Sequence, residues 1–255
     1  MIRISLALAG ALFACAGAAQ SEIRFGVMNE AYPPFFTKDA SGTWVGWEIE
    51  LMDAVCAELK EECSIVDMSW DGLIPGLASK KFDVIWSSMS ITPERRETID
   101  FTDRYYNTPS KLIGYADGVL GAGPQDVAGK TIGIQVSTIQ STYYAKYFKD
   151  VASEKTYSTL DEAFQDLAAG RIDYVFGDSI PLMEFLKTDF GKGCCEDKGN
   201  VVHDAEILGE GIGGGLRKED AALRDRLNTA IAALRANGTY AEISGKYFTF
   251  DPYGK

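Results

Sequence analysis

Two segments of the 255-residue chain repeat one pattern about ninety residues apart. The first is GLASKKFDVIWSS (76–88) and the second is DLAAGRIDYVFGD (166–178). Each is typical of a helix end, a tight turn, an apolar strand and then small polar residues. Asp83 and Asp173 take equivalent places, at the turn or the strand edge. Two copies of one unit predict two similar α/β lobes.

The rest of the chain alternates between strand and helix patterns in the same way. This alternation predicts mostly parallel sheets that are covered by helices on both faces. The predicted strands are 23–28, 63–68, 82–89, 130–136, 153–157 and 171–178, and the predicted helices are 47–59, 70–79, 140–148, 159–170 and 219–238.

Polar side chains follow one predicted strand of each lobe. Ser87, Ser88 and Ser90 follow the first, and Asp178 and Ser179 follow the second. Ligands of open α/β sheets bind beyond the carboxyl ends of the strands. Two lobes that face each other with these ends would therefore form a binding cleft.

The segment SITPERR (90–96) places two cations where a helix begins. Thr92 is typical of an N-cap and Pro93 of the first helical residue. Arg95 and Arg96 then lie near the positive end of the helix dipole, where exposed cations are disfavoured by up to ~1 kcal/mol each. One interpretation is that this end of the helix binds an anion.

Residues 1–20 have the pattern of a cleaved secretory signal, with a short apolar run followed by small residues. Cleavage is predicted near Ala18 to Gln20, which makes the mature protein an exported one. Acylation at Cys15, as in a lipoprotein, is the less favoured alternative, because Phe13 fits that motif poorly.

Charge and motifs exclude several classes of function. The chain has 25 Lys and Arg against 37 Asp and Glu, which argues against nucleic acid and anionic membranes as partners. His203 is the one histidine, and no hydrolase or metalloprotease motif is present. GEGIGG (209–214) follows both lobes and lacks the acidic residue of a dinucleotide site, so we expect a Gly-rich crossing there and no cofactor.

Four of the five cysteines remain once the signal is removed, and they allow three pairings. Cys56 and Cys63 are close enough in sequence to pair locally. Cys194 and Cys195 are adjacent and fit either a vicinal disulfide or two thiols. No second CxxC pair or histidine cluster accompanies them, so a zinc site is not expected.

Tyr32 and Trp70 lie in polar or proline-rich loops that follow strand ends. Aromatic residues most often pack in a core. Two rings that flank a cleft would instead enclose a ligand side chain, with cation–π attraction if that side chain is charged.

Taken together, these segments resemble the periplasmic amino-acid-binding proteins of ABC importers, solute-binding protein family 3. The chain is most similar to the lysine/arginine/ornithine-, histidine- and opine-binding members. The segments that carry the resemblance are AYPPF (31–35), GWEIEL (46–51), WDGLIPGL (70–77), SSMSITPERRETIDFTDRYY (87–106), GRIDYVFGD (170–178), GLRKED (215–220) and NGTYAEISGKYF (237–248).

The resemblance implies the two-lobed, type II periplasmic binding protein fold, an α/β fold with a two-stranded hinge. Mapped onto this sequence, extended crossovers fall near Asn107–Ser110 and Ala205–Leu208. Lobe 1 is then 22–108 plus 207–255, and lobe 2 is 109–206. The resemblance also selects Cys56–Cys63 as the disulfide pair.

The resemblance further implies a ligand site for an α-amino acid. Arg95 would bind the α-carboxylate, helped by Ser88, Ser90 and Thr138. Asp178 would bind the α-ammonium, although it also fits a cap for the following helix. Arg96 is expected at the surface.

Other family positions concern the ligand side chain. Ser87 would contact the ligand more distally, and Tyr32 and Trp70 would flank the ligand side chain. Asn29 stands where basic-amino-acid binders carry an acid, and Glu30 follows it, so either residue is a candidate for the far end of the ligand.

The sequence therefore predicts a monomeric periplasmic receptor that binds a free L-amino acid, basic or derived from a basic one, by lobe closure. It would deliver this ligand to an inner-membrane ABC permease without any cofactor. One alternative is an enzyme on the same scaffold, such as a cyclohexadienyl dehydratase, for which Glu30 is the one obvious acid. Another is a sensor that signals to a membrane partner.

Overall fold

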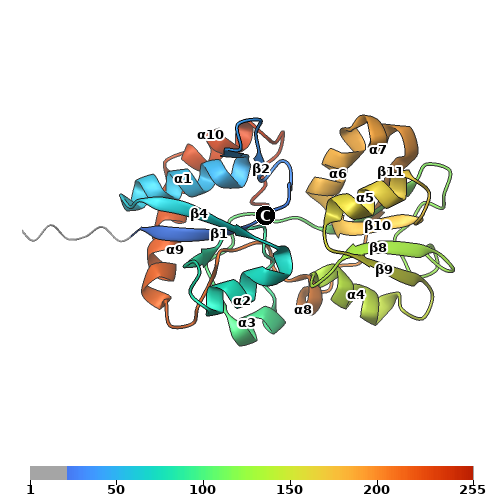
Figure 1. Cartoon of the computed structure of the whole chain (residues 1–255), viewed down its shortest axis with the longest axis horizontal. Coiled ribbons are helices and arrows are strands. Elements are labelled where there is room, and N and C mark those ends of the chain that lie inside the picture. Colours follow the sequence, from blue (N-terminus) through green and yellow to red (C-terminus); the bar gives the residue numbers. More distant parts are fainter. Residues whose placement is uncertain (1–21, 255) are drawn as a thin grey trace, which may run out of the picture.

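The computed structural model describes residues 22–254, which form two lobes side by side (Figure 1). The predicted signal peptide, with Cys15, lies outside the described residues. Within the described part, no helix is both long and apolar enough to cross a membrane.

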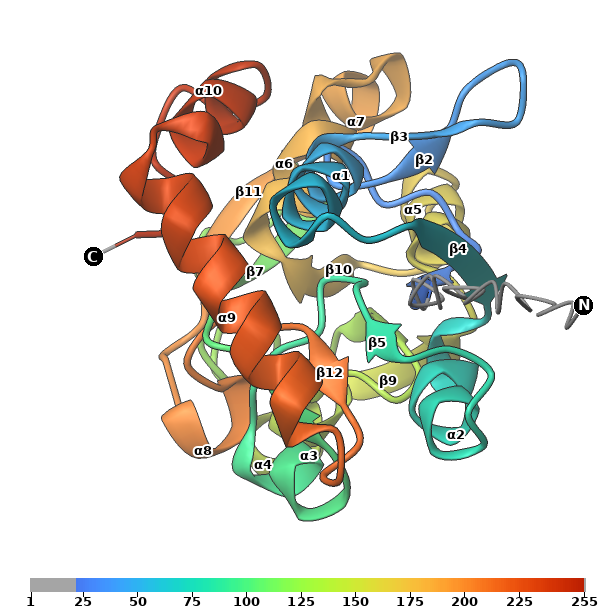
Figure 2. The same cartoon turned by 90° about the vertical axis from the view of Figure 1, so that its left-hand side faces the viewer.

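The first lobe takes its elements from both ends of the described chain. They are β1 (Ile23–Met28), β2 (Thr37–Lys38), β3 (Trp44–Val45), α1 (Trp47–Leu59), β4 (Cys63–Met68), the 3₁₀ turn η1 (Trp70–Gly72), α2 (Leu73–Ala78), β5 (Val84–Ile85), α3 (Pro93–Thr98), β6 (Asp100–Phe101), β12 (Gly215–Leu216), α9 (Ala221–Ala236) and α10 (Thr239–Gly245). Figure 2 shows that α9 runs across the outer face of this lobe.

The second lobe is built from the middle of the chain. Its elements are β7 (Ser110–Tyr115), β8 (Thr131–Gln135), α4 (Ile139–Tyr147), β9 (Ser153–Tyr157), α5 (Leu160–Ala168), β10 (Tyr174–Asp178), α6 (Ser179–Lys187), α7 (Asp189–Cys194) and β11 (Cys195–Asn200).

Each lobe has a five-stranded sheet, in the order β4-β1-β5-β12-β6 in the first and β11-β7-β10-β8-β9 in the second. Three consecutive strands of each sheet are parallel, as predicted: β4-β1-β5 and β10-β8-β9. The other two strands of each sheet join antiparallel. The predicted strand 82–89 is much shorter than expected, since only Val84–Ile85 pairs.

The two aspartates of the sequence repeat have the same role in the two lobes. Asp83 Oδ2 accepts a hydrogen bond from the backbone N–H of Arg24, at the start of β1 (3.1 Å). Asp173 Oδ2 accepts one from the backbone N–H of Thr131, at the start of β8 (2.8 Å). Each carboxylate thus satisfies an amide at the start of the parallel neighbouring strand, which confirms their placement at the turn or the strand edge.

Aromatic side chains fill the core of the first lobe where the chain leaves for the second. Trp86 stacks on Tyr105 with ring centres 4.3 Å apart, and Phe35 stacks on Tyr106 at 4.6 Å. Trp47 packs edge-on against Tyr106. All five rings are fully buried, so the residues that precede the first crossover are fixed by packing.

The second crossover differs from the prediction. Residues 205–208 are not extended but form the short helix α8 (Ala205–Leu208), because Asp204 caps it by accepting from the backbone N–H of Glu206 (3.1 Å). The chain returns instead through Gly209–Gly214. Ile212 pairs there with Tyr106, which immediately precedes the first crossover. Gly209 has φ +76°, and a Cβ on it would lie 2.2 Å from the carbonyl oxygen of Ile91, so this Gly-rich segment allows close packing.

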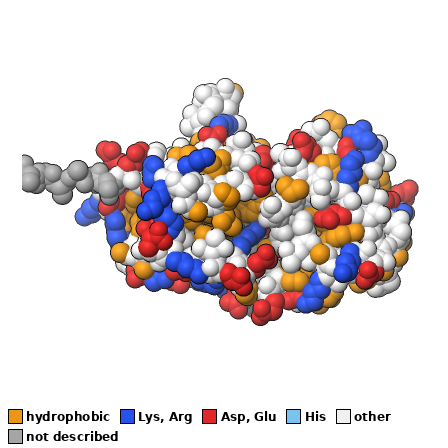
Figure 3. Space-filling view, turned by 60° about the horizontal axis from the view of Figure 1, so that its bottom comes forward, with side chains coloured by type: hydrophobic (Ala, Val, Ile, Leu, Met, Phe, Trp, Pro, Cys, Tyr) orange, Lys and Arg blue, Asp and Glu red, His pale blue; other side chains and the backbone are white. Residues whose placement is uncertain are grey.

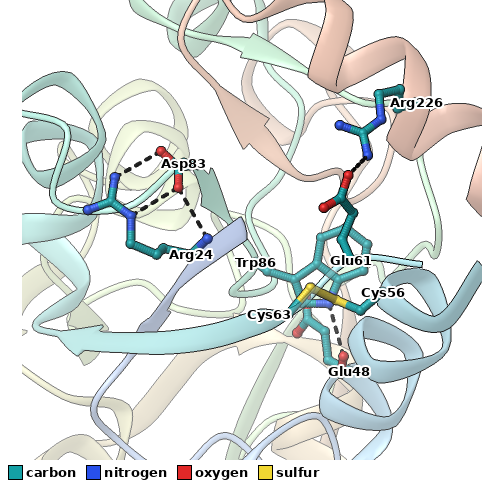
Figure 4. The surroundings of a disulfide bond; sticks show 8 residues. All are labelled: Arg24, Glu48, Cys56, Glu61, Cys63, Asp83, Trp86 and Arg226. Atoms are coloured by element: carbon teal, nitrogen blue, oxygen red, sulfur yellow. Dashed lines mark hydrogen bonds and ion pairs between the residues drawn. A yellow bond between two sulfur atoms is a disulfide. The ribbon is translucent and has the colours of Figure 1, made fainter. Parts of the chain in front are cut away.

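Cys56 and Cys63 form the predicted disulfide, which joins the end of α1 to the start of β4 (Figure 4). Beside it, Glu61 forms an ion pair with Arg226 of α9. Cys194 and Cys195 also form a disulfide, at the junction of α7 and β11.

We expect the double variant C56A/C63A to lose about 2.5 kcal/mol of unfolding free energy, because the bond closes a short loop of the unfolded chain. Urea unfolding of the ligand-free protein measures this loss. The matched control C194A/C195A removes a bond between adjacent residues, which constrains the unfolded chain little. Equal losses in the two variants would contradict the loop-closure account.

Candidate functional site

A cavity lies between the two lobes, at the carboxyl ends of the central strands. Both lobes contribute to its wall, as the repeat predicted. The lining residues are Met28, Tyr32, Trp70, Ser87, Ser88, Ser90 and Arg95 from the first lobe, and Gln135, Thr138, Ile139, Gln140, Leu160, Phe176, Gly177 and Asp178 from the second. Eight of the ten predicted ligand-binding residues are among them.

Arg95 brings a positive charge to this cavity. Thr92 caps α3 by accepting from the backbone N–H of Arg95 (3.2 Å), as predicted. The guanidinium donates from Nη1 to the carbonyl oxygen of Ser90 (3.0 Å) and lies over the ring of Trp70. Among the described residues no carboxylate forms an ion pair with it, and burial lowers the pKa of Arg95 to about 10. The cavity therefore contains a cation without an anionic partner.

Asp178 brings the opposite charge from the second lobe. Its carboxylate accepts hydrogen bonds from Tyr32 Oη (2.9 Å) and Gln140 Nε2 (2.9 Å). The residue takes the N-cap position of α6, but its side chain makes no capping hydrogen bond. Burial raises the pKa of Asp178 to about 6, although Tyr32, Gln140 and Arg95 each act to lower it. No cation among the described residues forms an ion pair with this buried carboxylate.

The two lobes are in contact around the cavity. Tyr32 of the first lobe donates to Asp178 of the second. Trp70 Nε1 donates across the cleft to the carbonyl oxygen of Ser137 (3.1 Å). These two aromatic residues, selected from the sequence, thus line the cavity and also contact the opposite lobe, which identifies this arrangement as the closed one.

The pocket hydroxyls differ in whether they can still donate a hydrogen bond to a ligand or can only accept one. Ser88 has φ +55° and donates both its backbone N–H (2.9 Å) and its hydroxyl (2.7 Å) to the carboxylate of Glu48. Its oxygen can therefore only accept from a ligand. Ser87 Oγ accepts from the backbone N–H of Met28 (2.9 Å), which leaves its own proton to donate. Thr138 Oγ1 donates to the carbonyl oxygen of Gln135 (2.8 Å).

Glu48 was not recognised from the sequence as a site residue. It is fully buried, and besides Ser88 it accepts from Tyr105 Oη. Trp86 Nε1 donates to its backbone carbonyl oxygen (2.9 Å), a contact drawn in Figure 4. Glu48 thus connects the pocket serine to the aromatic core before the first crossover. The available signal was an acid between two apolar residues in GWEIEL. The same pattern is equally typical of an exposed position on a helix, so it does not identify a buried acid.

The two candidates for the far end of the ligand lie in different places. The side chain of Asn29 is exposed and does not line the cavity. Glu30 is half-buried at the edge of the cavity, where it accepts from Gln135 Nε2 of the opposite lobe (3.0 Å). Burial raises the pKa of Glu30, whereas the hydrogen bonds from Gln135 and from the Trp70 backbone lower it.

Several lining residues were missed because their sequence context is unremarkable. Four of them are apolar and were therefore expected in the hydrophobic core: Met28, Ile139, Leu160 and Phe176. Gln135 and Gln140 are single amides at a strand end and in a helix. In the described part of the chain, no group of three or more His, Cys, Asp and Glu residues is placed to hold a metal ion.

Comparison with known proteins gives consistent similarities. Residues 23–250 match the family model of bacterial extracellular solute-binding proteins, family 3. The chain is 41% identical to the L-arginine-binding protein of Pseudomonas aeruginosa over 93% of this chain and 92% of that protein. It is 39% identical to the histidine-binding periplasmic protein of Salmonella typhimurium, over 99% and 98% of the two chains.

Solved structures show the same similarity to amino-acid-binding proteins. An ancestral arginine-binding protein bound to arginine is 30% identical and superposes with a TM-score of 0.81, covering 89% of this chain and 98% of that one. A periplasmic protein of the His/Glu/Gln/Arg/opine-binding family from Silicibacter pomeroyi, in complex with lysine, is 32% identical with a TM-score of 0.79 over 91% and 100%. A 27% identical ancestral amino-acid-binding protein, described as a precursor of cyclohexadienyl dehydratase, has a TM-score of 0.78 over 89% of this chain and 95% of that one.

We expect Arg95→Ala to weaken binding of every ligand of this cavity by ~3 kcal/mol or more, because the ligand's anionic group is left buried without a partner. Calorimetric titration measures the loss. Arg96→Ala is the matched control, since Arg96 is exposed and pairs with Asp100 on the surface (3.2 Å). Near-normal affinity in Arg95→Ala would show that the ligand binds elsewhere.

Binding of a cationic group at Asp178 should release a proton below neutral pH. The pKa of the ligand-free carboxyl is raised from 3.8 to about 6, and a bound cation favours the charged form. At pH 5 the ligand-free carboxyl of Asp178 is therefore mostly protonated, and it must lose this proton before it can bind the cation. We expect affinity to fall about tenfold from pH 7 to pH 5 for this reason. Calorimetry at pH 5 in two buffers with different ionisation enthalpies counts the released protons. A count of zero would mean that Asp178 does not meet the cation.

Proposed function

Because the chain belongs to family 3 of the bacterial extracellular solute-binding proteins, we propose that it is a periplasmic receptor for a free basic L-amino acid. The ligand is bound between the lobes and passed to an inner-membrane ABC permease. No bond of the ligand is made or broken.

One observation carries the proposal: a cation and a carboxylate face the same cavity, and neither forms an ion pair with any other described residue. A buried charge is costly unless it is paired. Arg95 lies on the first lobe and Asp178 on the second. A zwitterion neutralises both at once, with its α-carboxylate on Arg95 and its α-ammonium on Asp178. Because the two partners are on different lobes, the ligand favours the closed form.

The hydroxyls divide between the two charged groups of the ligand. The backbone N–H and the hydroxyl of Ser88 both donate to Glu48, so neither is free to donate to a ligand. We therefore assign the Ser88 oxygen to the α-ammonium and not to the carboxylate that the family resemblance suggested. Ser90 stays with the carboxylate. Thr138 Oγ1 donates to the carbonyl oxygen of Gln135, so its hydroxyl, like that of Ser88, can only accept. We therefore assign the carboxylate to the start of α4 and not to the Thr138 hydroxyl. Thr138 is the N-cap of α4 but makes no side-chain capping bond, so the first amides of that nine-residue helix are directed at the anion.

The proposed basic side chain follows from the charges around Glu30. Asp71 and Glu162 both act to raise its pKa, which means that the acids are close enough to repel one another. A cation at the far end of the ligand relieves this repulsion, and the ring of Trp70 supplies an apolar face. Relatives named for arginine, histidine, and lysine/arginine/ornithine binding support the same class.

The proposed moving units are lobe 1 (22–108 plus 207–255) and lobe 2 (109–206), acting as a monomer. On the face shown in Figure 3, Lys and Arg are interspersed with Asp and Glu and do not form a basic patch. That pattern agrees with a small-molecule ligand in place of nucleic acid. The neighbour described above as a precursor of cyclohexadienyl dehydratase is itself described as amino-acid-binding, which favours a receptor over the dehydratase alternative.

We expect arginine, lysine, ornithine or histidine to bind best, and glutamate and aspartate to bind worst, since a second carboxylate would meet Glu30 in a desolvated cleft. Glu30→Gln should weaken cationic ligands by ~1–3 kcal/mol and leave neutral ones unchanged. Calorimetric titration of both proteins with arginine, glutamine and glutamate checks this. Tight glutamate binding by the wild type, or unchanged arginine affinity in the variant, would reject the proposed ligand class.

A further inference from the structure

Gln135 is the last residue of β8, and its side chain reaches the cavity from the second lobe. It is almost completely buried, with 6% of its surface exposed. A buried amide needs partners for its two donors and its acceptor. What each atom of this amide contacts therefore determines what the residue can do for a ligand.

The amide nitrogen is committed to two oxygens. Nε2 donates to Glu30 Oε2 across the cleft (3.0 Å) and to the carbonyl oxygen of Ser158 in its own lobe (3.1 Å). Neither oxygen has a proton to give when Glu30 is charged. Turning the amide over would place Oε1 against both oxygens, so this orientation is fixed by chemistry.

The amide oxygen is left for the cavity. Within residues 22–254, Oε1 accepts no hydrogen bond, and it is not one of the fully shielded polar atoms without a partner. Gln135 lines the cavity, and Glu30 lies next to it as the partner of its Nε2. An amide and a carboxylate from opposite lobes thus lie next to each other beside the cavity.

Gln135 also acts on Glu30 itself. Its hydrogen bond opposes the effect of burial and of the neighbouring acids Asp71 and Glu162 on the pKa of Glu30. Because the two residues belong to different lobes, this contact exists only when the cleft is closed. Glu30 is thereby oriented, and its charged form is favoured, in the form that encloses the ligand.

We propose that Gln135 is a specificity-determining residue: its Oε1 accepts a hydrogen bond from the cationic end of the ligand's side chain, while its Nε2 orients Glu30. This inference rests on the proposed function and adds to it the preference for a side chain that ends only in N–H donors. A neutral side chain that ends in a carbonyl group presents an oxygen to Oε1 and to Glu30, and is disfavoured.

The test compares L-arginine with L-citrulline, a neutral ligand of the same length whose side chain ends in a urea. In Gln135→Leu we expect the Kd for arginine to rise at least tenfold and the Kd for citrulline to change less than threefold, by calorimetry. The preference for arginine over citrulline therefore falls. Gln165→Leu is the matched control, because Gln165 is exposed on α5, where it donates to Asp161, and both affinities should stay at wild-type values.

A double-mutant cycle separates this role from a general loss of structure. If Gln135 acts through Glu30, the variant E30Q/Q135L should lose less arginine affinity than the product of the two single losses. Thermal unfolding of each ligand-free variant reports on the fold. Gln135→Met, of similar length and without strong donors or acceptors, replaces Gln135→Leu if the latter does not fold.

The outcomes distinguish the inference from the function on which it rests. A wild-type protein that binds no basic amino acid overturns the proposed function, and the inference with it. A wild-type protein that prefers arginine, together with a Gln135→Leu variant that keeps the same preference, overturns the inference alone. Strictly multiplicative losses in the cycle would assign Gln135 a contact that is independent of Glu30.

Discussion

Two opposite charges that have no ion-pair partner within residues 22–254 determine how this protein is organised. Arg95 and Asp178 are placed on different lobes and face one small cavity. Each would be costly to bury alone, since desolvation penalises the charged form. In the closed form the protein compensates in part: the Ser90 carbonyl group and the Trp70 ring contact Arg95, and Tyr32 and Gln140 donate to Asp178. The rest of the neutralisation is left for a zwitterion, which makes the ligand part of the interface.

The remaining structure keeps these charges in position. The crossovers begin and end in rigid surroundings, because buried aromatic rings precede the first and glycines pack the second closely against it. Glu48 extends this order into the site, since its buried carboxylate accepts from Ser88 in the pocket and from Tyr105 next to the crossover. A change at the hinge and a change at the ligand are thus connected through one side chain.

Much of the fold follows from local patterns. The repeated helix–strand unit predicted two lobes, and the strands 23–28 and 63–68 have the predicted bounds. The cap at Thr92 and the disulfide Cys56–Cys63 also agree. Two predictions of local structure were wrong. The predicted strand 82–89 is mostly loop, because its later residues leave the sheet and line the cavity. The predicted extended crossover 205–208 is a short helix, because Asp204 caps it.

The sequence by itself determined which chemical groups reach the cleft. Polar residues after strand ends and arginines at a helix start are visible as patterns, because strand and helix periodicity fix where those ends are. Only the tertiary structure decided which hydrogen-bond donors and acceptors of each group remain free for a ligand. Ser88 is left as an acceptor by Glu48, 40 residues away, and Gln135 is oriented by Glu30, 105 residues away. Hydrogen-bonding capacity is used up by partners that are close in space and distant in sequence, and no local pattern records which partners those are.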